Sequence, residues 1–282
     1  MPKLATSDSP SPEVLRSSWE PLGRMMLDYL EGDSTAAATV VRRDGRREPF
    51  EGSDLFRSDG FPMAEELALE LARGRVLDAG AGAGAHALEL QRRGHQVVAL
   101  DVSPSAVEVM RRRGVEDPRA GSLLDLHPKR QQERFDTLLL LMNGAGLGST
   151  LEGLEQLLRH CHGLLRPGGS ILLDGADLRR TEHPLEQRSL GRRVLDGRYF
   201  GEVHMHLEYR GLVGAPFQWL FIDHRTLRFQ ARRAGWVSQV LFEDDEGAYL
   251  ARLTPQPGYS TGRSPGQSPR SSTGHSAGRS EV

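Results

Sequence analysis

Cysteine and long apolar runs are scarce in this chain. Cys161 is the only cysteine among 282 residues, which excludes an intramolecular disulfide and fits a reducing compartment. No stretch approaches the roughly 18 apolar residues that a membrane span needs, and the N-terminal residues lack the apolar core of a signal peptide. We therefore expect a soluble, cytoplasmic protein with no membrane partner.

An excess of charge of one sign is also missing. The formal net charge is −2 and the calculated pI is about 6.6. Lysine occurs only at Lys3 and Lys129, so arginine carries nearly all of the positive charge. Such a balance creates no overall field that would attract nucleic acid. We expect no nucleic-acid partner, and the sequence does not indicate an oligomeric state.

The two ends of the chain are poor in apolar residues. The N-terminal stretch is rich in Ser, Pro and Asp, and the chain from Pro255 onward is mostly Gly, Ser, Pro and Thr with scattered Arg. Such segments bury too little apolar surface to offset the entropy lost on ordering. We expect residues 1–18 and 255–282 to be disordered and the C-terminal tail to be dispensable.

The most informative segment is residues 76–84, in which two apolar residues and Asp78 precede Gly80, Gly82 and Gly84. A buried strand, a glycine turn and a helix from Ala85 onward are typical of a nucleotide site, where backbone approaches the ligand closely. The spacing is not G-x-G-x-x-G, and no Lys-Ser or Lys-Thr follows, which excludes a Walker loop. A dinucleotide site and a glycine turn without a ligand remain as alternatives.

A second strand signal follows about 20 residues later, the spacing that a ribose-binding acid requires. The apolar residues 96–100 lead into Asp101, and Ser103 with Pro104 then marks a helix start. An acid at this strand tip can accept hydrogen bonds from both ribose hydroxyls. The alternative for Asp101 is an ordinary residue at the start of a helix.

Strands and helices alternate through the middle of the chain, which predicts a parallel sheet covered on both faces. We expect strands at residues 75–79, 96–101, 118–122, 135–142 and 170–174. A helix is predicted over 150–165 from leucines spaced three and four apart. His160, Cys161 and His162 lie inside it and point to different sides, so we expect Cys161 in the core and no metal site.

Further elements flank this alternating region. Residues 19–30 form an amphipathic pattern, 39–50 a hairpin turning at Asp44 and Gly45, and 61–71 a helix. Toward the C-terminus we predict strands at 199–209 and 217–221, a helix at 223–234, and a hairpin of 236–242 with 248–253.

The glycine turn, Asp101 and the run Phe135 to Gly144 together resemble the class I S-adenosylmethionine-dependent methyltransferases, over roughly residues 20–254. The resemblance implies an α/β, Rossmann-like fold with a seven-stranded, mostly parallel sheet and an antiparallel last strand. It also implies an N-terminal lid over 19–73, a core over 74–254 and a β insertion at 176–222. The small-molecule branch, types 11 and 12, is the most similar.

The same resemblance implies S-adenosyl-L-methionine as cofactor and an in-line transfer of its methyl group to a small-molecule acceptor. Residues for the cofactor are, by matching position, Asp78, Gly80, Ala81, Gly82, Gly84, Asp101, Val102, Ser122, Leu123, Met142, Asn143 and Gly144. Near the adenine, either Ser122 supplies a contact or Asp125 substitutes. Arg57 is a candidate for the methionine carboxylate, with an exposed arginine as the alternative.

A general base is needed only if the acceptor must lose a proton, and histidine is its usual form. His86, His204 and His206 are the candidates, although a solvated strand face also explains the last two. Asn143 is not followed by two prolines and an aromatic residue, and no Pro-Cys pair is present, so DNA base methylation is not expected.

Two rival functions remain open from the sequence. An aminopropyl transferase on the same scaffold would need an acidic pocket, and the segment 143–146 carries no acid. A binding module that kept the pocket but lost catalysis is the other. For the methyltransferase, we expect the acceptor to be covered by the N-terminal helix near Tyr29, by Phe56 with Arg57, and by the aromatic-rich residues 199–221.

Overall fold

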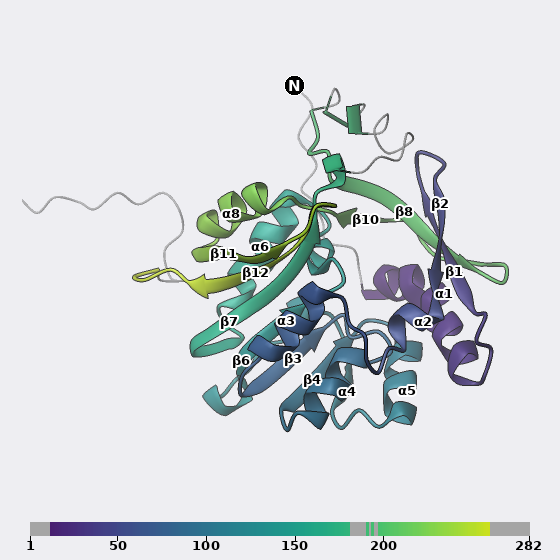
Figure 1. Ribbon diagram of the computed structural model, residues 1–282, viewed down its shortest axis with the longest axis horizontal. Helices are drawn as coiled ribbons and strands as arrows, with labels where there is room; N and C mark the ends of the chain where they lie inside the picture. Colours follow the sequence, from purple (N-terminus) through teal and green to yellow (C-terminus); the bar gives the residue numbers. More distant parts are fainter. Residues whose placement is uncertain (1–11, 181–189, 192, 195–196, 260–282) are drawn as a thin grey trace, which may run out of the picture.

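The computed structural model describes residues 12–180, 190–191, 193–194 and 197–259. Its centre is a seven-stranded sheet in the order β11-β12-β7-β6-β3-β4-β5 (Figure 1). The strands are β3 (Arg75–Ala79), β4 (Gln96–Asp101), β5 (Pro118–Ala120), β6 (Phe135–Leu140), β7 (Leu165–Ala176), β11 (Trp236–Glu243) and β12 (Ala248–Pro255). Strands β3 to β7 pair in parallel, and β12 enters antiparallel to β7, as predicted.

Helices cover both faces of this sheet. α6 (Leu151–Cys161) and α8 (His224–Arg233) pack on one face, and α3 (Met63–Leu71), α4 (Ala85–Arg92) and α5 (Pro104–Arg113) on the other. Strand β6 shows why: Leu138 and Leu140 pack in the core under α6 and α8, whereas Leu139 packs in the core under α3, α4 and α5. An unbroken apolar run is the pattern of a parallel strand buried on both faces.

Side-chain caps fix where three of these helices begin. Ser103 accepts a hydrogen bond from the amide of Ala106 at the start of α5, and Thr150 accepts one from Gly153 at the start of α6. Asp223 accepts from the amides of Arg225 and Thr226 at the start of α8. Such caps satisfy amides that have no partner within the helix. Residues of these types therefore indicate in the sequence where a helix begins.

A second sheet lies beside the first and joins segments far apart in the chain. Its order is β10-β8-β1-β2, with β9 paired to β8, and all its pairings are antiparallel. The N-terminal hairpin supplies β1 (Ala37–Arg42) and β2 (Arg47–Glu51); the insertion supplies β8 (Glu202–Tyr209), β9 (Leu212–Val213) and β10 (Phe217–Leu220). The two segments predicted separately therefore form one layer.

Helix α1 (Pro12–Leu30) connects the two sheets, because it packs against α5 on one side and β8 on the other (Figure 1). Met25 and Met26 are buried in this contact with Leu207 and Tyr209. The helix begins earlier than the predicted residue 19, and Ser18 is fully buried. Residues 12–18 are thus ordered, and only residues 1–11 of the segment expected to be disordered lie outside the described residues.

Several predicted element ends were wrong, including those of the strand expected at 170–174, which spans Leu165–Ala176. Strand β5 stops at Ala120 and β6 at Leu140, and Met142, two residues beyond β6, has a left-handed φ of +58° that extended backbone does not allow. Helix α6 stops at Cys161, and the chain re-enters the sheet at Leu165. The residues between Leu165 and Ser170 then form a bulge opposite Phe135 and Thr137.

The described helices do not include one that is long and apolar enough to cross a membrane. Cys161 is fully buried on the apolar stripe of α6, as predicted, and burial raises the pKa of its thiol to about 12. Within the described ranges, no three His, Cys, Asp or Glu side chains are arranged to hold a metal ion.

The start of the C-terminal tail docks on the domain, contrary to prediction. Pro255 is the last residue of β12, and the amide of Gln256 donates to the carbonyl of Gly235. Tyr259 stacks on His162 at 4.9 Å between ring centroids, and His162 stacks in turn on buried Trp236 at 4.1 Å. Residues 260–282 lie outside the described residues.

We expect truncation after Thr254 to lower the melting temperature, whereas truncation after Tyr259 removes none of these contacts. Aromatic pairs contribute about 0.5–1.5 kcal/mol, and 1 kcal/mol shifts the melting temperature of a domain this size by about 2–4 °C. Thermal unfolding of both truncations and of Tyr259→Ala measures the difference. Equal melting temperatures for the two truncations would contradict the docking.

Candidate functional site

The glycine turn between β3 and α4 has the backbone that its sequence predicts. Gly80, Gly82 and Gly84 have φ values of +80°, +54° and +81°, a region unfavourable for residues with a side chain. The amides of Gly80 and Ala81 both donate to the carbonyl of Leu100, which ties the turn to β4. The turn thereby lies at the carboxyl edge of the parallel sheet, where such folds bind ligands.

Asp101, at the tip of β4, closes this turn. One of its carboxylate oxygens accepts the Gly82 amide at 2.9 Å, and the other accepts the Ser103 amide at 2.8 Å. Burial raises the pKa of Asp101, although these amide hydrogen bonds oppose the rise. The predicted acid is therefore in contact with the predicted glycine turn. Each carboxylate oxygen has a further lone pair for a ligand hydroxyl.

Two buried oxygens at this edge lack a hydrogen-bond partner among the described residues. They are Oδ2 of Asp78, at the end of β3, and Oδ1 of Asn143, just beyond β6. Burial raises the pKa of Asp78 to about 6, although the charge of His86 opposes this. Unsatisfied buried acceptors are rare in folded proteins, and such groups often belong to a ligand site.

Arg57 and His86 meet at a shared acid that the sequence analysis did not identify. The Arg57 guanidinium lies 2.8 and 3.0 Å from the two carboxylate oxygens of Glu65, and His86 Nε2 lies 2.7 Å from one of them. Burial by itself would lower the pKa of His86, but Glu65, Asp78 and Asp174 raise it. Arg57 is therefore not an isolated exposed residue, and its Nε is buried without a partner in the described chain.

The backbone beyond β6 takes an unusual path. Met142 and Asn143 have φ values of +58° and +62°, and their amides, with that of Gly144, all donate to the carboxylate of Asp174 on β7. The Asn143 side-chain amide donates to the carbonyl of Leu220 on β10. The predicted residues Met142 to Gly144 thus connect the core sheet to the insertion.

A small hollow of about 40 Å³ lies beyond the ends of β4 and β5. Its lining consists of Leu15, Arg16, Val102, Gly121, Ser122 and Asp125. Ser122 and Asp125, the two alternatives for the adenine contact, therefore face the same space. The Ser122 hydroxyl also accepts the Leu124 amide, and the predicted Leu123 points instead into the core. The first turns of α1 cover this hollow.

His204 and His206 lie on the half-exposed side of β8. Along β8 they alternate with buried Met205 and Leu207, and it is the buried side that packs on α1. His206 lies 3.0 Å from Glu208, which pairs with Arg47 across the outer face. Both histidines are half-buried, and burial together with nearby arginines lowers the pKa of His204. Their role as general bases stays a prediction.

Aromatic side chains form a wall next to the end of β6. Trp219 of β10 packs against Gly146, where an added Cβ would lie 2.0 Å from the indole ring. Trp19 of α1 contacts Trp219 and Phe217 with ring centroids 5.2 and 4.9 Å apart. We call the set of Trp19, Phe217 and Trp219 the aromatic wall. Phe217 and Trp219 belong to the segment 199–221 predicted to cover the acceptor, whereas Trp19 lies on α1, ten residues before Tyr29.

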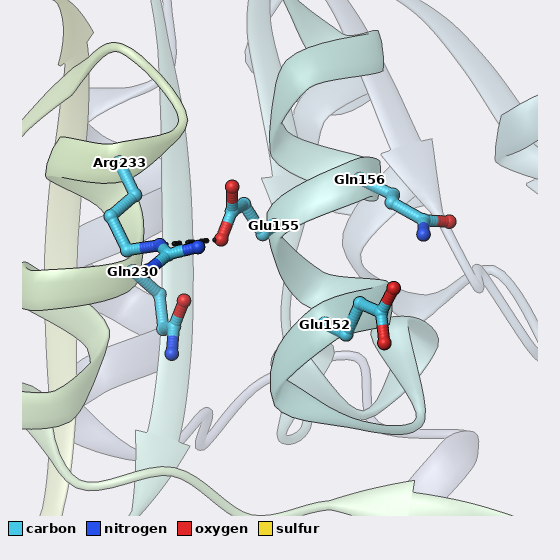
Figure 2. A pocket seen from close by; sticks show the side chains of 5 residues that line it. All are labelled: Glu152, Glu155, Gln156, Gln230 and Arg233. Atoms are coloured by element: carbon cyan, nitrogen blue, oxygen red, sulfur yellow. Dashed lines mark hydrogen bonds and ion pairs between the residues drawn. The ribbon is translucent and has the colours of Figure 1, made fainter. Parts of the chain in front are cut away.

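A wider hollow of about 430 Å³ lies elsewhere, between α6 and α8 (Figure 2). Glu152, Glu155, Gln156, Gln230 and Arg233 line it. Glu155 and Arg233 form an ion pair across it at 2.7 Å, so their charges already satisfy each other. Its lining includes no residue of the glycine turn or of the strand ends, and it is not part of the candidate site.

Asp174 carried a signal that the sequence analysis missed. It follows the apolar run Ile171 to Leu173, just as Asp78 and Asp101 follow theirs. Glu65 carried no such signal, because an acid in the first turn of a helix is usually exposed. Its burial follows from the packing of α3 beside α4.

Comparison with known proteins agrees with this geometry. Residues 76–169 match the model of a family described as "Methyltransferase domain". Ubiquinone biosynthesis O-methyltransferases are similar: that of Xanthomonas euvesicatoria is 36% identical over 124 residues, 40% of this chain and 46% of the relative. That of Xanthomonas oryzae is 33% identical over 149 residues, 49% of this chain and 55% of the relative. The chain thus spans about half the length of these curated relatives.

A solved structure extends the likeness to nearly the whole fold. It is a SAM-dependent methyltransferase from Bacteroides fragilis in complex with S-adenosyl-L-homocysteine, 36% identical, with a TM-score of 0.74. The match covers 86% of this chain and 98% of that one. By this likeness, its sheet order and its glycine motif, the chain belongs to the class I S-adenosylmethionine-dependent methyltransferases.

Proposed function

We propose that this protein transfers the methyl group of S-adenosylmethionine to a small-molecule acceptor. The observation that carries the proposal is the pair of buried, unpartnered oxygens on Asp78 and Asn143, beside a glycine turn that Asp101 holds in place. The Bacteroides fragilis relative is a methyltransferase solved with S-adenosyl-L-homocysteine, the demethylated form of this cofactor.

The polar groups of the site fit the parts of this cofactor. The free oxygens of Asp78 and Asn143 suit a ligand ammonium group, and the unpartnered Nε of Arg57 suits a carboxylate. The remaining lone pairs of Asp101 suit the ribose hydroxyls. The hollow lined by Val102, Ser122 and Asp125 lies on the side where the adenine would follow. We therefore assign these residues to cofactor binding.

The proposed reaction requires mainly that the protein align the methyl donor with the acceptor. The cofactor supplies a methyl group already activated on a sulfonium, and methyl transfer is an in-line displacement. The protein residues position the two reactants and exclude water. The aromatic wall supplies apolar surface for an acceptor next to the β6 end, where Asn143 also lies. Relatives named as O-methyltransferases support an oxygen atom as acceptor.

His86 acts in this proposal by holding the start of α4 rather than by removing a proton. It is buried, and its Nε2 is already engaged with Glu65. A base must be within hydrogen-bond reach of the proton it removes. The pairing with Glu65 and Arg57 instead links α4 to α3 and to the segment after α2 (Gly52–Leu55).

The rival functions are less well supported. An aminopropyl transferase needs free acids for a polyamine, whereas the acid nearest the β6 end, Asp174, accepts three backbone amides. A module that binds the cofactor without catalysis would not need an apolar wall for an acceptor. Trp19, Phe217 and Trp219 are all only half-buried, which leaves aromatic surface for a second ligand.

Replacing Asp101 with Ala should weaken binding of S-adenosylhomocysteine about tenfold to a hundredfold. Loss of hydrogen bonds to a charged group costs about 1.5–3 kcal/mol. Calorimetric titration of the variant against wild type measures the change. Asp117→Ala is the control, because Asp117 pairs with exposed Arg119 and does not contact the turn. A change below about twofold for Asp101→Ala would remove it from the site.

Asp78→Asn should stabilise the free protein at neutral pH and weaken its binding of the cofactor. A folded pKa of about 6, above the reference 3.8, means that the stability linked to this group is complete below pH 3.8 and is lost as pH rises through 6. The variant should therefore melt above wild type at pH 7.5, with the gap closing toward pH 4.5. Thermal unfolding across pH measures this; a lower melting temperature at pH 7.5 would contradict it.

Binding of S-adenosylhomocysteine should slow amide hydrogen exchange in α1, in α2 and in β10, in addition to the glycine turn. α1 and β10 meet at the aromatic wall, and Leu55 of α2 lies beside Gly82 of the glycine turn. α8 and β11, which lie at the end of the strand order remote from β3 and β4, serve as internal controls. Protection confined to the turn and the strand ends, with α1, α2 and β10 unchanged, would count against a lid.

A further inference from the structure

The residues beyond β6 hold a conformation that their own side chains disfavour. Met142 and Asn143 are consecutive residues with left-handed φ values, which are uncommon for residues other than glycine. Such backbone persists only where surrounding contacts determine it, and it concentrates at functional sites. The contacts here must come from a neighbouring element, because β6 itself ends at Leu140.

Asp174 supplies those contacts. Its Oδ2 accepts the Met142 amide at 2.9 Å, and its Oδ1 accepts the amides of Asn143 and Gly144 at 2.7 and 3.1 Å. The carboxylate is in place because Leu173, its neighbour on β7, pairs with Leu140, the last residue of β6. One side chain therefore satisfies three consecutive amides at the point where the strand ends.

We propose that Asp174 is a positioning residue for methyl transfer: its carboxylate fixes the left-handed segment Met142–Asn143–Gly144 and so sets where Asn143 meets the cofactor and the insertion. This inference rests on the proposed function of the site. Asn143 is the link, since its Oδ1 is free at the cofactor side and its Nδ2 donates to Leu220 of β10. Asp174 itself is assigned no contact with either reactant.

The positioning depends on the ionised form of Asp174, because a protonated carboxyl oxygen would present a donor toward amides that are also donors. Burial raises the pKa of Asp174 to about 6, opposed by the three amides and reinforced by the charge of Glu65 on α3. The other titratable groups that interact with it are His86 of α4 and Tyr249 of β12. Protonation of Asp174 as pH falls through about 6 should therefore weaken the hydrogen bonds that fix this segment.

Asp174→Asn tests this inference, because it keeps the shape but places a donor amide among donors. At pH 8 the variant should bind S-adenosylhomocysteine at least about tenfold more weakly than wild type. Toward pH 5 the ratio of the two dissociation constants should approach one, as wild-type Asp174 becomes protonated. Asp78 titrates in both proteins, so its effect cancels from the ratio.

Asp136→Asn is the matched control. Asp136 also accepts a backbone amide, that of Arg75, and pairs with Arg166, but it lies at the opposite end of β6. The Asp136→Asn substitution should leave the affinity for S-adenosylhomocysteine within about twofold of wild type at both pH values. An Asp174→Asn affinity equal to that of Asp136→Asn at pH 8, or a ratio to wild type that does not change with pH, would overturn the inference.

Hydrogen exchange and proton shifts of backbone amides test the inference independently of the proposed function. Without cofactor, the amides of Met142, Asn143 and Gly144 should exchange faster in Asp174→Asn, whereas those of Leu138 to Leu140 should not. If the variant does not fold, the same three amide proton shifts in wild type should titrate together near pH 6; their failure to do so would overturn the inference. Absence of S-adenosylhomocysteine binding by wild type would instead reject the proposed function, and the exchange of these amides would then decide the role of Asp174.

Discussion

Backbone amides at the carboxyl edge of the sheet need acceptors, and aspartates at the strand ends supply them. Asp101 at the end of β4 accepts amides of the glycine turn and of its own helix start, and Asp174 on β7 accepts three amides beyond β6. A buried amide without a partner costs about as much as a lost hydrogen bond. The same carboxylates that satisfy the chain therefore also shape the candidate site, and the glycine turn depends on neighbouring elements for its conformation.

This arrangement concentrates negative charge where solvent is scarce. Burial raises the pKa values of Asp78 and Asp174 to about 6, and Glu65 is kept with Arg57 and His86. Perturbed acids at one edge of a sheet are typical of functional sites, where stability is given up for ligand contacts. Asp78 differs from Asp174 in that its Oδ2 is buried without a hydrogen-bond partner in the described chain.

The layer above the site joins the N-terminal segment to the late insertion. Strand β1 pairs with β8, and α1 lies beneath this sheet against α5. Trp19 and Trp219, 200 residues apart in the chain, consequently meet beside the end of β6. A hairpin alone is marginally stable in water, so the N-terminal hairpin and the insertion strands depend on each other. The aromatic wall therefore forms only when both are in place.

The sequence by itself determined the elements whose signals are local. The alternation of apolar strands with helices predicted the parallel core, and the strand ends placed Asp78 and Asp101 at one edge. The glycine turn and the helices that begin at Ser103, Thr150 and Asp223 also follow from local residues. Only the tertiary structure decided the burial of Glu65, the docking of Tyr259 and the pairing of β1 with β8. These depend on contacts between residues distant in the chain, which leave no periodicity or spacing within a short segment. Strand ends were misjudged for a related reason: the left-handed turn at Met142 is stabilised by Asp174 on another strand, not by the residues that form it.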